Sequence, residues 1–230
     1  MTIPRRSTQL VLDLPHRPAL EREDFLVSPS NAKAVDWMDR WPDWPGGILA
    51  LSGPKACGKS HLIEVWRARS GAGLIAASDL SGESWLALDT GMAVDDMSAL
   101  TDETALLHAI NWSREKGSSL LLAGETPPNT WDVRLPDLKS RLATIQVAEV
   151  GAPDDALLEA LMVKQFADRQ LSVTPEVIAY LRTRIDRSFE AARQMVERLD
   201  LAALAEKRAI TLPFARRILN DGESPRRDLA

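Results

Sequence analysis

The sequence predicts a three-layer α/β domain built on a parallel sheet, followed by a small all-α subdomain. Three observations lead to this fold class. Short apolar runs of strand length alternate with helical segments as far as about residue 150. A glycine-containing turn follows the first of these runs directly and leads into a helix. Beyond residue 150 the strand-like runs give way to a succession of helix start signals.

The composition is that of an ordinary globular protein. The 230 residues include 45% hydrophobic and 27% charged residues, and the net charge is −5. This charge disfavours strong direct DNA binding, although it leaves room for a local basic patch. The single cysteine, Cys57, excludes an internal disulfide and a cysteine-built metal cage. A reducing cytoplasm suits such a chain, and no apolar run has the length of a membrane span.

The N-terminal part, residues 1–24, is expected to form a flexible tail because it is rich in proline and mixed charges. It contains one apolar island around Leu10 to Leu14, which is too short and too polar for a signal peptide. A helix is expected from about residue 30 to residue 40. Pro42 and Pro45 end it, because proline cannot continue a helix.

The α/β domain is expected to span residues 25–150. Short apolar runs mark the strands, and amphipathic segments mark the helices between them. The predicted strands are 48–51, 74–77, 92–94, 120–123 and 143–147, and the predicted helices are 60–69 and 103–116.

The all-α subdomain is expected to span residues 151–220, with a C-terminal tail at 221–230. Pro153-Asp154 and Thr174-Pro175 are start signals for two helices, the first of which extends to about residue 169. A third helix is predicted at about 188–207, and a short final one at 213–219.

The turn after the first predicted strand carries the phosphate-loop pattern G-x-x-x-x-G-K-S. Its glycines let backbone N–H groups face phosphates, its lysine reaches the β- and γ-phosphates, and its serine hydroxyl is a ligand for Mg²⁺. The pattern comprises Gly53, Pro54, Lys55, Ala56, Cys57, Gly58, Lys59 and Ser60, and His61 follows as a further candidate for nucleotide binding. Cys57 is either a small residue that fills the loop or a thiol with a lowered pKa near a helix N-terminus.

Two acids follow the apolar run 92–94. A strand beside the phosphate-loop strand commonly delivers one carboxylate to Mg²⁺ and a second toward the attacking water. We therefore assign Asp95 to the metal and Asp96 to the water. Asp89, after the apolar run 86–88, is a rival that offers a single acid, and ordinary loop acids are the plain alternative.

Further candidates for contact with the nucleotide follow the fourth strand and lie in the all-α subdomain. Glu125 or Thr126 is placed to sense the γ-phosphate, although the charge of Glu125 needs a nearby cation or water. Arg141 is a candidate for an arginine finger that acts on a neighbouring molecule. Arg187 or Arg193 is a candidate for a lid arginine, and pairing with nearby glutamates is an equally good explanation for either.

Taken in order, these pieces resemble the DnaA-related AAA+ family, and within it the short regulatory branch of Hda-type inactivators. The likeness rests on a few ordered segments. These are Phe25 to Asn31, the phosphate loop, Asp95-Asp96, Pro127-Pro128, Asp137 to Leu142 and Arg187-Ser188-Phe189. The resemblance implies a AAA+ fold with a lid, a bound ADP or ATP with Mg²⁺, and a place near the adenine for Phe25 and Asn31. The chain's length leaves no room for the initiator's DNA-binding helices, which favours the inactivator.

The resemblance also implies partners. Gln9, Leu10, Leu12 and Leu14 are similar to the peptide by which such proteins dock on the DNA polymerase sliding clamp. A short segment of this kind orders on binding, with the amide hydrogen-bonded and the leucines in an apolar pocket. The implied activity is stimulation, through Arg141, of ATP hydrolysis on DnaA. DNA is then reached only through the clamp, the bound nucleotide acts mainly as a structural ligand, and self-association stays open.

Two other functions fit the same residues. A stand-alone AAA+ ATPase, such as a helicase loader, would use Asp95 and Asp96 for its own turnover. A non-catalytic scaffold would bind nucleotide and join the clamp to a partner without needing Arg141. Without the resemblance, the leucine segment reads as a strand that packs on the core.

Overall fold

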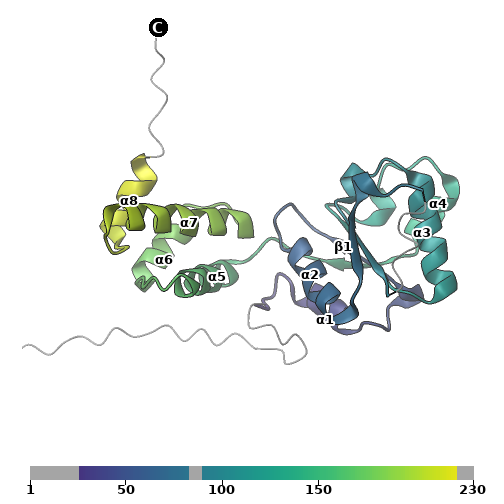
Figure 1. The fold of residues 1–230 in the computed structure, drawn as a ribbon, viewed down its shortest axis with the longest axis horizontal. Helices are drawn as coiled ribbons and strands as arrows, with labels where there is room; N and C mark the ends of the chain where they lie inside the picture. The colour runs from purple at the N-terminus through teal and green to yellow at the C-terminus, as the bar shows by residue number, and fades with distance from the viewer. Residues whose placement is uncertain (1–25, 83–89, 222–230) are drawn as a thin grey trace, which may run out of the picture. The chain divides into compact units, whose positions relative to one another are not determined.

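The computed structural model describes residues 26–82 and 90–221. The described residues form two compact units, which divide at the step from Asp154 to Asp155 (Figure 1). The first unit is α/β and the second is all-α. The predicted fold class is therefore confirmed.

The first unit contains a five-stranded parallel sheet with the order β2-β3-β4-β1-β5. The strands are β1 (Ile48–Ser52), β2 (Gly73–Ala76), β3 (Met92–Asp95), β4 (Leu120–Gly124) and β5 (Gln146–Glu149). One expectation is wrong: β3 does not lie beside the phosphate-loop strand β1, because β4 pairs with both and separates them.

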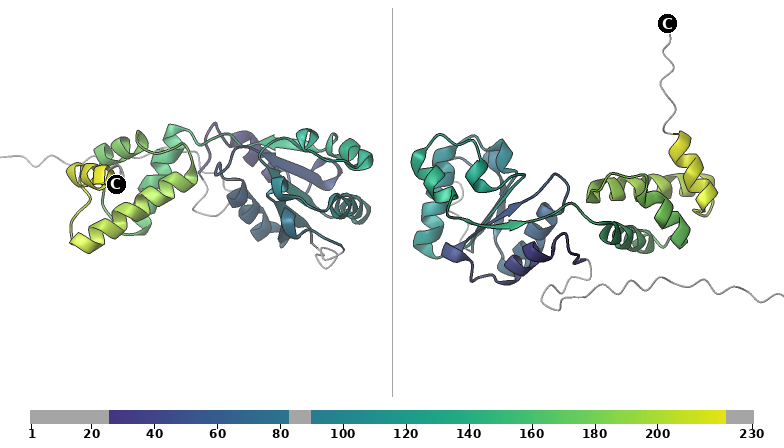
Figure 2. Two further views of the ribbon diagram at one scale, coloured as in Figure 1. Left: turned by 90° about the horizontal axis from the view of Figure 1, so that it is seen from above. Right: turned by 180° about the vertical axis from the view of Figure 1, so that it is seen from behind.

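Helices cover both faces of this sheet (Figures 1 and 2). They are α1 (Ala32–Asp39), α2 (Lys59–Ser70), α3 (Glu103–Lys116) and α4 (Pro136–Leu142). Leu49 and Leu51 of β1 pack in one core with buried residues of α1 and α2. Ile48 and Ala50 pack in the other core with those of α3 and α4. The continuous apolar run of β1 follows from this burial on both faces.

Local signals set the helix ends. Asp102 accepts a hydrogen bond from the N–H of Ala105 at 2.9 Å and so caps α3, and Gly117, at φ +66°, ends it. Short 3₁₀ turns occupy Pro45–Gly47, Ala77–Asp79, Met97–Ala99 and Pro128–Thr130.

The last strand begins later than predicted. Residues 143–145 were expected to start it, yet they close the end of α4. The N–H of Ala143 donates to the carbonyl of Lys139, and the N–H of Thr144 donates to that of Arg141. The apolar run 143–147 thus belongs partly to the end of a helix. Periodicity over so few residues does not distinguish a helix end from a strand.

The second unit consists of four helices around its own core. They are α5 (Asp155–Asp168), α6 (Pro175–Arg182), α7 (Phe189–Glu206) and α8 (Leu212–Asp221). Phe166 is fully buried there, among buried aliphatic side chains from all four helices. Ser188 caps α7 by accepting a hydrogen bond from the N–H of Ala191 at 3.0 Å. Within 26–82 and 90–221, no helix has the length and apolar content needed to cross a bilayer.

Candidate nucleotide-binding site

The loop between β1 and α2 has the conformation that a phosphate cradle requires. Gly58, at φ +103°, lies at the N-terminus of α2, and Ala56 also has a positive φ of 55°. A Cβ on Gly53 would lie 2.1 Å from the carbonyl oxygen of Val150, so only glycine fits there. The loop therefore curls at the carboxyl end of the sheet and leads directly into the positive end of α2.

Lys59 lies over this loop. Its Nζ donates to the carbonyl oxygens of Gly53 at 2.7 Å and Pro54 at 2.8 Å. The ammonium is thus held by two weak acceptors on the loop itself. Phosphate oxygens are stronger, charged acceptors for the same group.

Cys57 fills the inside of the loop. The side chain is 2% exposed, and burial raises the pKa of its thiol, with the charge of Lys59 opposing that rise. The alternative of a thiol activated by a lowered pKa therefore has no support.

A serine and an aspartate meet beside the loop. Ser60 Oγ donates to Asp95 Oδ2 at 2.8 Å, although 35 residues separate them in sequence. The other oxygen of Asp95 accepts the N–H of Asp96 at 2.8 Å. Hydroxyl and carboxylate oxygens are the ligands that Mg²⁺ prefers, usually with phosphate oxygens completing the shell. The described residues contain no cluster of three His, Cys, Asp or Glu side chains that would hold a metal alone.

Asp96 follows with a strained backbone. It lies in the left-handed region at φ 56° and is exposed. Its carboxylate accepts a hydrogen bond from the hydroxyl of Ser98. This conformation turns the chain sharply after β3, so Asp95 and Asp96 project differently from the end of one strand.

The loop after β4 is joined to the phosphate loop by charge. Glu125 Oε1 lies 3.3 Å from Lys55 Nζ, which supplies the cation that its carboxylate needs. The carbonyl of Thr126 accepts a hydrogen bond from the indole N–H of Trp131 at 2.9 Å. Lys55 was predicted as a member of the loop, but nothing in the sequence pairs it with Glu125.

Comparison with known proteins agrees with this geometry. A family model described as the Hda lid domain matches residues 154–219. Domain III of the replication initiation protein DnaA from Thermotoga maritima matches with a TM-score of 0.74 at 18% identity, over 90% of this chain and 98% of that one. AMPPCP-bound DnaA from Aquifex aeolicus matches with a TM-score of 0.67 at 18% identity, over 89% and 71%.

Residues 154–219 thus match the Hda lid family, and the fold as a whole is like that of DnaA domain III. A curated relative, an uncharacterized protein of Haemophilus influenzae, is 29% identical over 120 residues, which are 51% of this chain and 52% of that protein. The match thus spans about half the length of that relative. The Hda-type lid coincides with the second compact unit, α5 to α8.

Asn31 holds the segment that leads into the α/β unit. Its Oδ1 accepts the N–H of Ser28, and its Nδ2 donates to the carbonyl of Leu26, both at 2.9 Å. The side chain is 4% exposed, so its polar atoms fix the backbone of the segment. His61 is exposed in the first turn of α2. Phe25, the rival Asp89 and the peptide with Gln9, Leu10, Leu12 and Leu14 lie outside the described residues.

Arg141 lies near the end of α4 and is 30% exposed. Its Nε is 3.5 Å from Asp137 Oδ2, one turn earlier on the same helix. Glu103 at the start of α3 holds the segment before this helix, because its carboxylate accepts the N–H groups of Arg134 and Leu135 at 2.8 to 2.9 Å. Sequence reasoning missed this contact, which joins residues more than 30 positions apart.

The two candidate arginines of the Hda-type lid differ in their partners. Arg193 forms a bidentate pair with Glu190, one turn away on α7, which lowers the pKa of Glu190. Arg187 precedes α7 and pairs with Asp155 at the start of α5, with 3.0 Å between Nη2 and Oδ1. Both side chains are more than half exposed.

Proposed function

We propose that this protein is a nucleotide-binding regulator of replication initiation, which stimulates hydrolysis of the ATP bound to DnaA. The observation that carries the proposal is the Hda-type lid behind a complete phosphate loop. The likeness to DnaA supports a related ATPase as partner. One of the similar DnaA structures contains bound AMPPCP, which supports an adenine nucleotide as ligand.

The nucleotide is held by the loop that ends at Ser60. Backbone N–H groups of the loop and the positive end of α2 bind the phosphates, and Lys59 exchanges its carbonyl partners for phosphate oxygens. Ser60 and Asp95 would hold Mg²⁺, which neutralises phosphate charge when bound. Asp96 lies beside them and is the candidate for orienting water. The bound nucleotide, ADP or ATP, acts mainly as a structural ligand.

The effect on DnaA is exerted in trans through Arg141. A guanidinium that reaches the phosphates of a neighbour stabilises the charge of the transition state. Arg141 lies at an accessible end of α4, and its partner Asp137 is an exposed carboxylate that phosphate can replace. The peptide with Gln9, Leu10, Leu12 and Leu14 would recruit the protein to the DNA-loaded sliding clamp. Arg187 or Arg193 would serve as the lid arginine.

The experiment measures hydrolysis of ATP pre-bound to DnaA, with and without this protein and the DNA-loaded clamp. We expect Arg141→Ala to lower the stimulated rate about a thousand-fold, as for other arginine fingers. Lys139→Ala, an exposed cation on the same helix, is the control and should retain stimulation. The double variant Gln9→Ala with Leu10→Ala should abolish only the part of the stimulation that depends on the clamp. Full stimulation by Arg141→Ala would refute the trans mechanism.

A further inference from the structure

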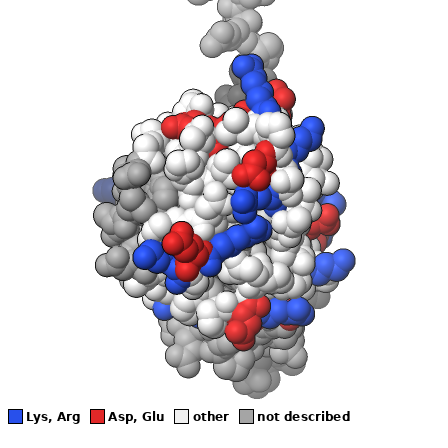
Figure 3. Space-filling model, turned by 90° about the vertical axis from the view of Figure 1, so that its right-hand side faces the viewer, with Lys and Arg blue, Asp and Glu red and all other residues white. Residues whose placement is uncertain are grey.

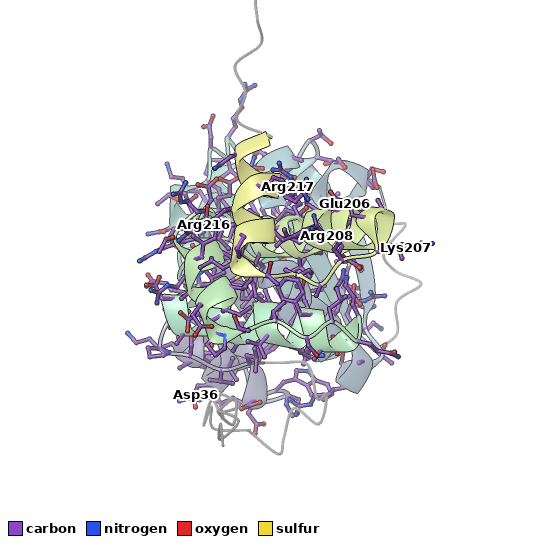
Figure 4. All side chains as sticks on the ribbon, turned by 90° about the vertical axis from the view of Figure 1, so that its left-hand side faces the viewer. Asp36, Glu206, Lys207, Arg208, Arg216 and Arg217 are labelled. Carbon is purple, nitrogen blue, oxygen red and sulfur yellow. The ribbon has the colours of Figure 1, made fainter. Side chains whose placement is uncertain are left out.

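One end of the lid carries cations around α8. This α8 basic surface consists of Arg184, Arg198, Lys207, Arg208, Arg216 and Arg217. All six side chains are exposed, in a chain whose net charge is −5. Figure 4 shows Arg216 on one side of α8, and Lys207, Arg208 and Arg217 on the other. The composition did not exclude a local basic patch, and the structure shows one around α8.

Aromatic rings hold three of these guanidinium groups in place. Arg184 and Arg216 both lie over the ring of Tyr180, at 5.2 and 5.5 Å from its centroid. Arg217 lies over the ring of Phe214 at 5.2 Å. Cation–π contacts fix the position of a guanidinium without using its N–H donors. For Arg184 and Arg216 these donors stay available for an anionic ligand, and less side-chain freedom is lost when one binds. Arg217 instead donates to the carboxylate of Glu206.

Carboxylates neutralise little of this surface. Glu206 pairs with Arg217 at 2.6 Å and with Arg208 at 3.8 Å, and Arg198 donates to the carbonyl of Ile218. Arg184, Lys207 and Arg216 have no carboxylate partner in the part of the chain that the structure describes.

Other arginines of the same lid are paired. Arg182 contacts Asp155 and Glu159, and Arg187 and Arg193 have the carboxylate partners already described. The α/β unit also differs, because acidic and basic side chains are interspersed on the face that Figure 3 shows. Within the described part of the lid, the arginines without a carboxylate partner thus belong to the α8 basic surface.

We infer that the α8 basic surface binds the phosphate backbone of duplex DNA, without reading its sequence. A polyanion with regularly spaced phosphates matches several fixed guanidinium groups, and arginine donors suit phosphate oxygens. The rings of Tyr180 and Phe214 already carry guanidinium groups, so they offer no platform for stacking unpaired bases. The inference goes beyond the proposed function and does not depend on it. It adds a direct contact with DNA to the expected route through the clamp.

The test is fluorescence anisotropy with a labelled 30-base-pair duplex of arbitrary sequence, titrated between about 50 and 200 mM salt. We expect Arg184→Ala with Arg216→Ala to weaken binding at least ten-fold at low salt. The slope of log K against log salt should fall by about 2, since each phosphate contact contributes about 0.9. The matched control is Arg169→Ala with Arg182→Ala, which removes two arginines of the same lid that pair with carboxylates and should change neither quantity.

A second variant guards against unfolding, since the first removes contacts to Tyr180. Lys207 is exposed. Lys207→Gln should lower the slope of log K against log salt by about 1 without changing the thermal midpoint. Equal losses in the control variant, or an unchanged slope, would overturn the inference. Tighter binding to a single strand than to the duplex would also overturn it. Displacement of the duplex by polyglutamate at equal charge concentration would point instead to an acidic protein partner.

Discussion

Gly53 occupies a position where backbone crowding, rather than backbone flexibility, demands glycine. The loop that it begins passes so close to Val150 that a Cβ would lie 2.1 Å from the carbonyl oxygen and 2.9 Å from Cys57 Sγ. Neither neighbour can yield cheaply, because one is backbone and the other is buried. The packing that shapes the phosphate loop therefore depends on this residue.

Replacing Gly53 by alanine should destabilise the protein by about 2–3 kcal/mol, the usual cost of overpacking a tight site. It should also abolish nucleotide binding by displacing the loop. Gly117→Ala is the control: its φ is +66°, but a Cβ there meets nothing within 4 Å. That variant should cost only about 1 kcal/mol. Urea unfolding measures both changes, and equal losses would contradict the role of the Val150 contact.

At the residue scale, the sequence predicted what short spacing determines. The order of glycines, lysine and serine from Gly53 to Ser60 identifies the loop because the chemistry is contiguous. The pair of Lys55 with Glu125 could not be predicted, because it depends on two strands lying side by side. Ser60 and Asp95 were both assigned to the metal, and the structure brings them into contact.

At the scale of elements, Glu103 joins two helices. It lies in the first turn of α3, and its carboxylate accepts hydrogen bonds from consecutive N–H groups just before α4. These bonds, from Arg134 first and then Leu135, lower the pKa of Glu103. Since α4 carries Arg141, Glu103 acts as a positioning residue for it.

The lowered pKa of Glu103 gives a pH-dependent prediction. The ionised carboxylate is favoured in the folded state, so its stabilisation is complete above the ordinary pKa of 4.5 and disappears as the pH falls through the lowered folded value. Glu103→Gln should therefore lower the thermal midpoint at pH 7, and the gap to the parent should close as the pH falls below 4.5.

Glu115→Gln, an exposed acid on the same helix, is the control for that experiment. It should show no comparable gap at pH 7. A gap for Glu103→Gln that stayed constant from pH 7 to pH 3 would show that packing, rather than the carboxylate, is responsible.

The elements also show why α4 and β5 were harder to predict than β1 or α3. The strand β1 is a continuous apolar run, and α3 has an acidic cap and a terminal glycine. The helix α4 has only seven residues, and its end passes directly into a turn before β5. Such a short helix gains most of its stability from burying Leu138 and Leu142, which depends on the tertiary fold.

At the scale of the molecule, the order of elements along the chain was predictable, whereas the order of strands in the sheet was not. Alternation of apolar runs and helices gives a parallel sheet, but it does not say that β4 lies between β1 and β3. That arrangement brings the ends of β1, β4 and β3 to one edge. Ser60 contacts Asp95 there, and Glu125 contacts Lys55 of the phosphate loop.

This convergence predicts how the whole protein responds to nucleotide. A ligand that binds only the folded state at a hundred times its Kd stabilises it by about 2.7 kcal/mol. For a chain of this size, ADP should raise the thermal midpoint by about 5 °C or more. Lys59→Ala should lose this shift, since Lys59 Nζ is held at the carbonyl oxygens of the phosphate loop. Lys55→Ala should retain most of it, because that side chain is 82% exposed and contacts Glu125 instead. Scanning calorimetry with each variant measured against its own nucleotide-free midpoint separates the two lysines, and an equal shift in both would show that the nucleotide binds elsewhere.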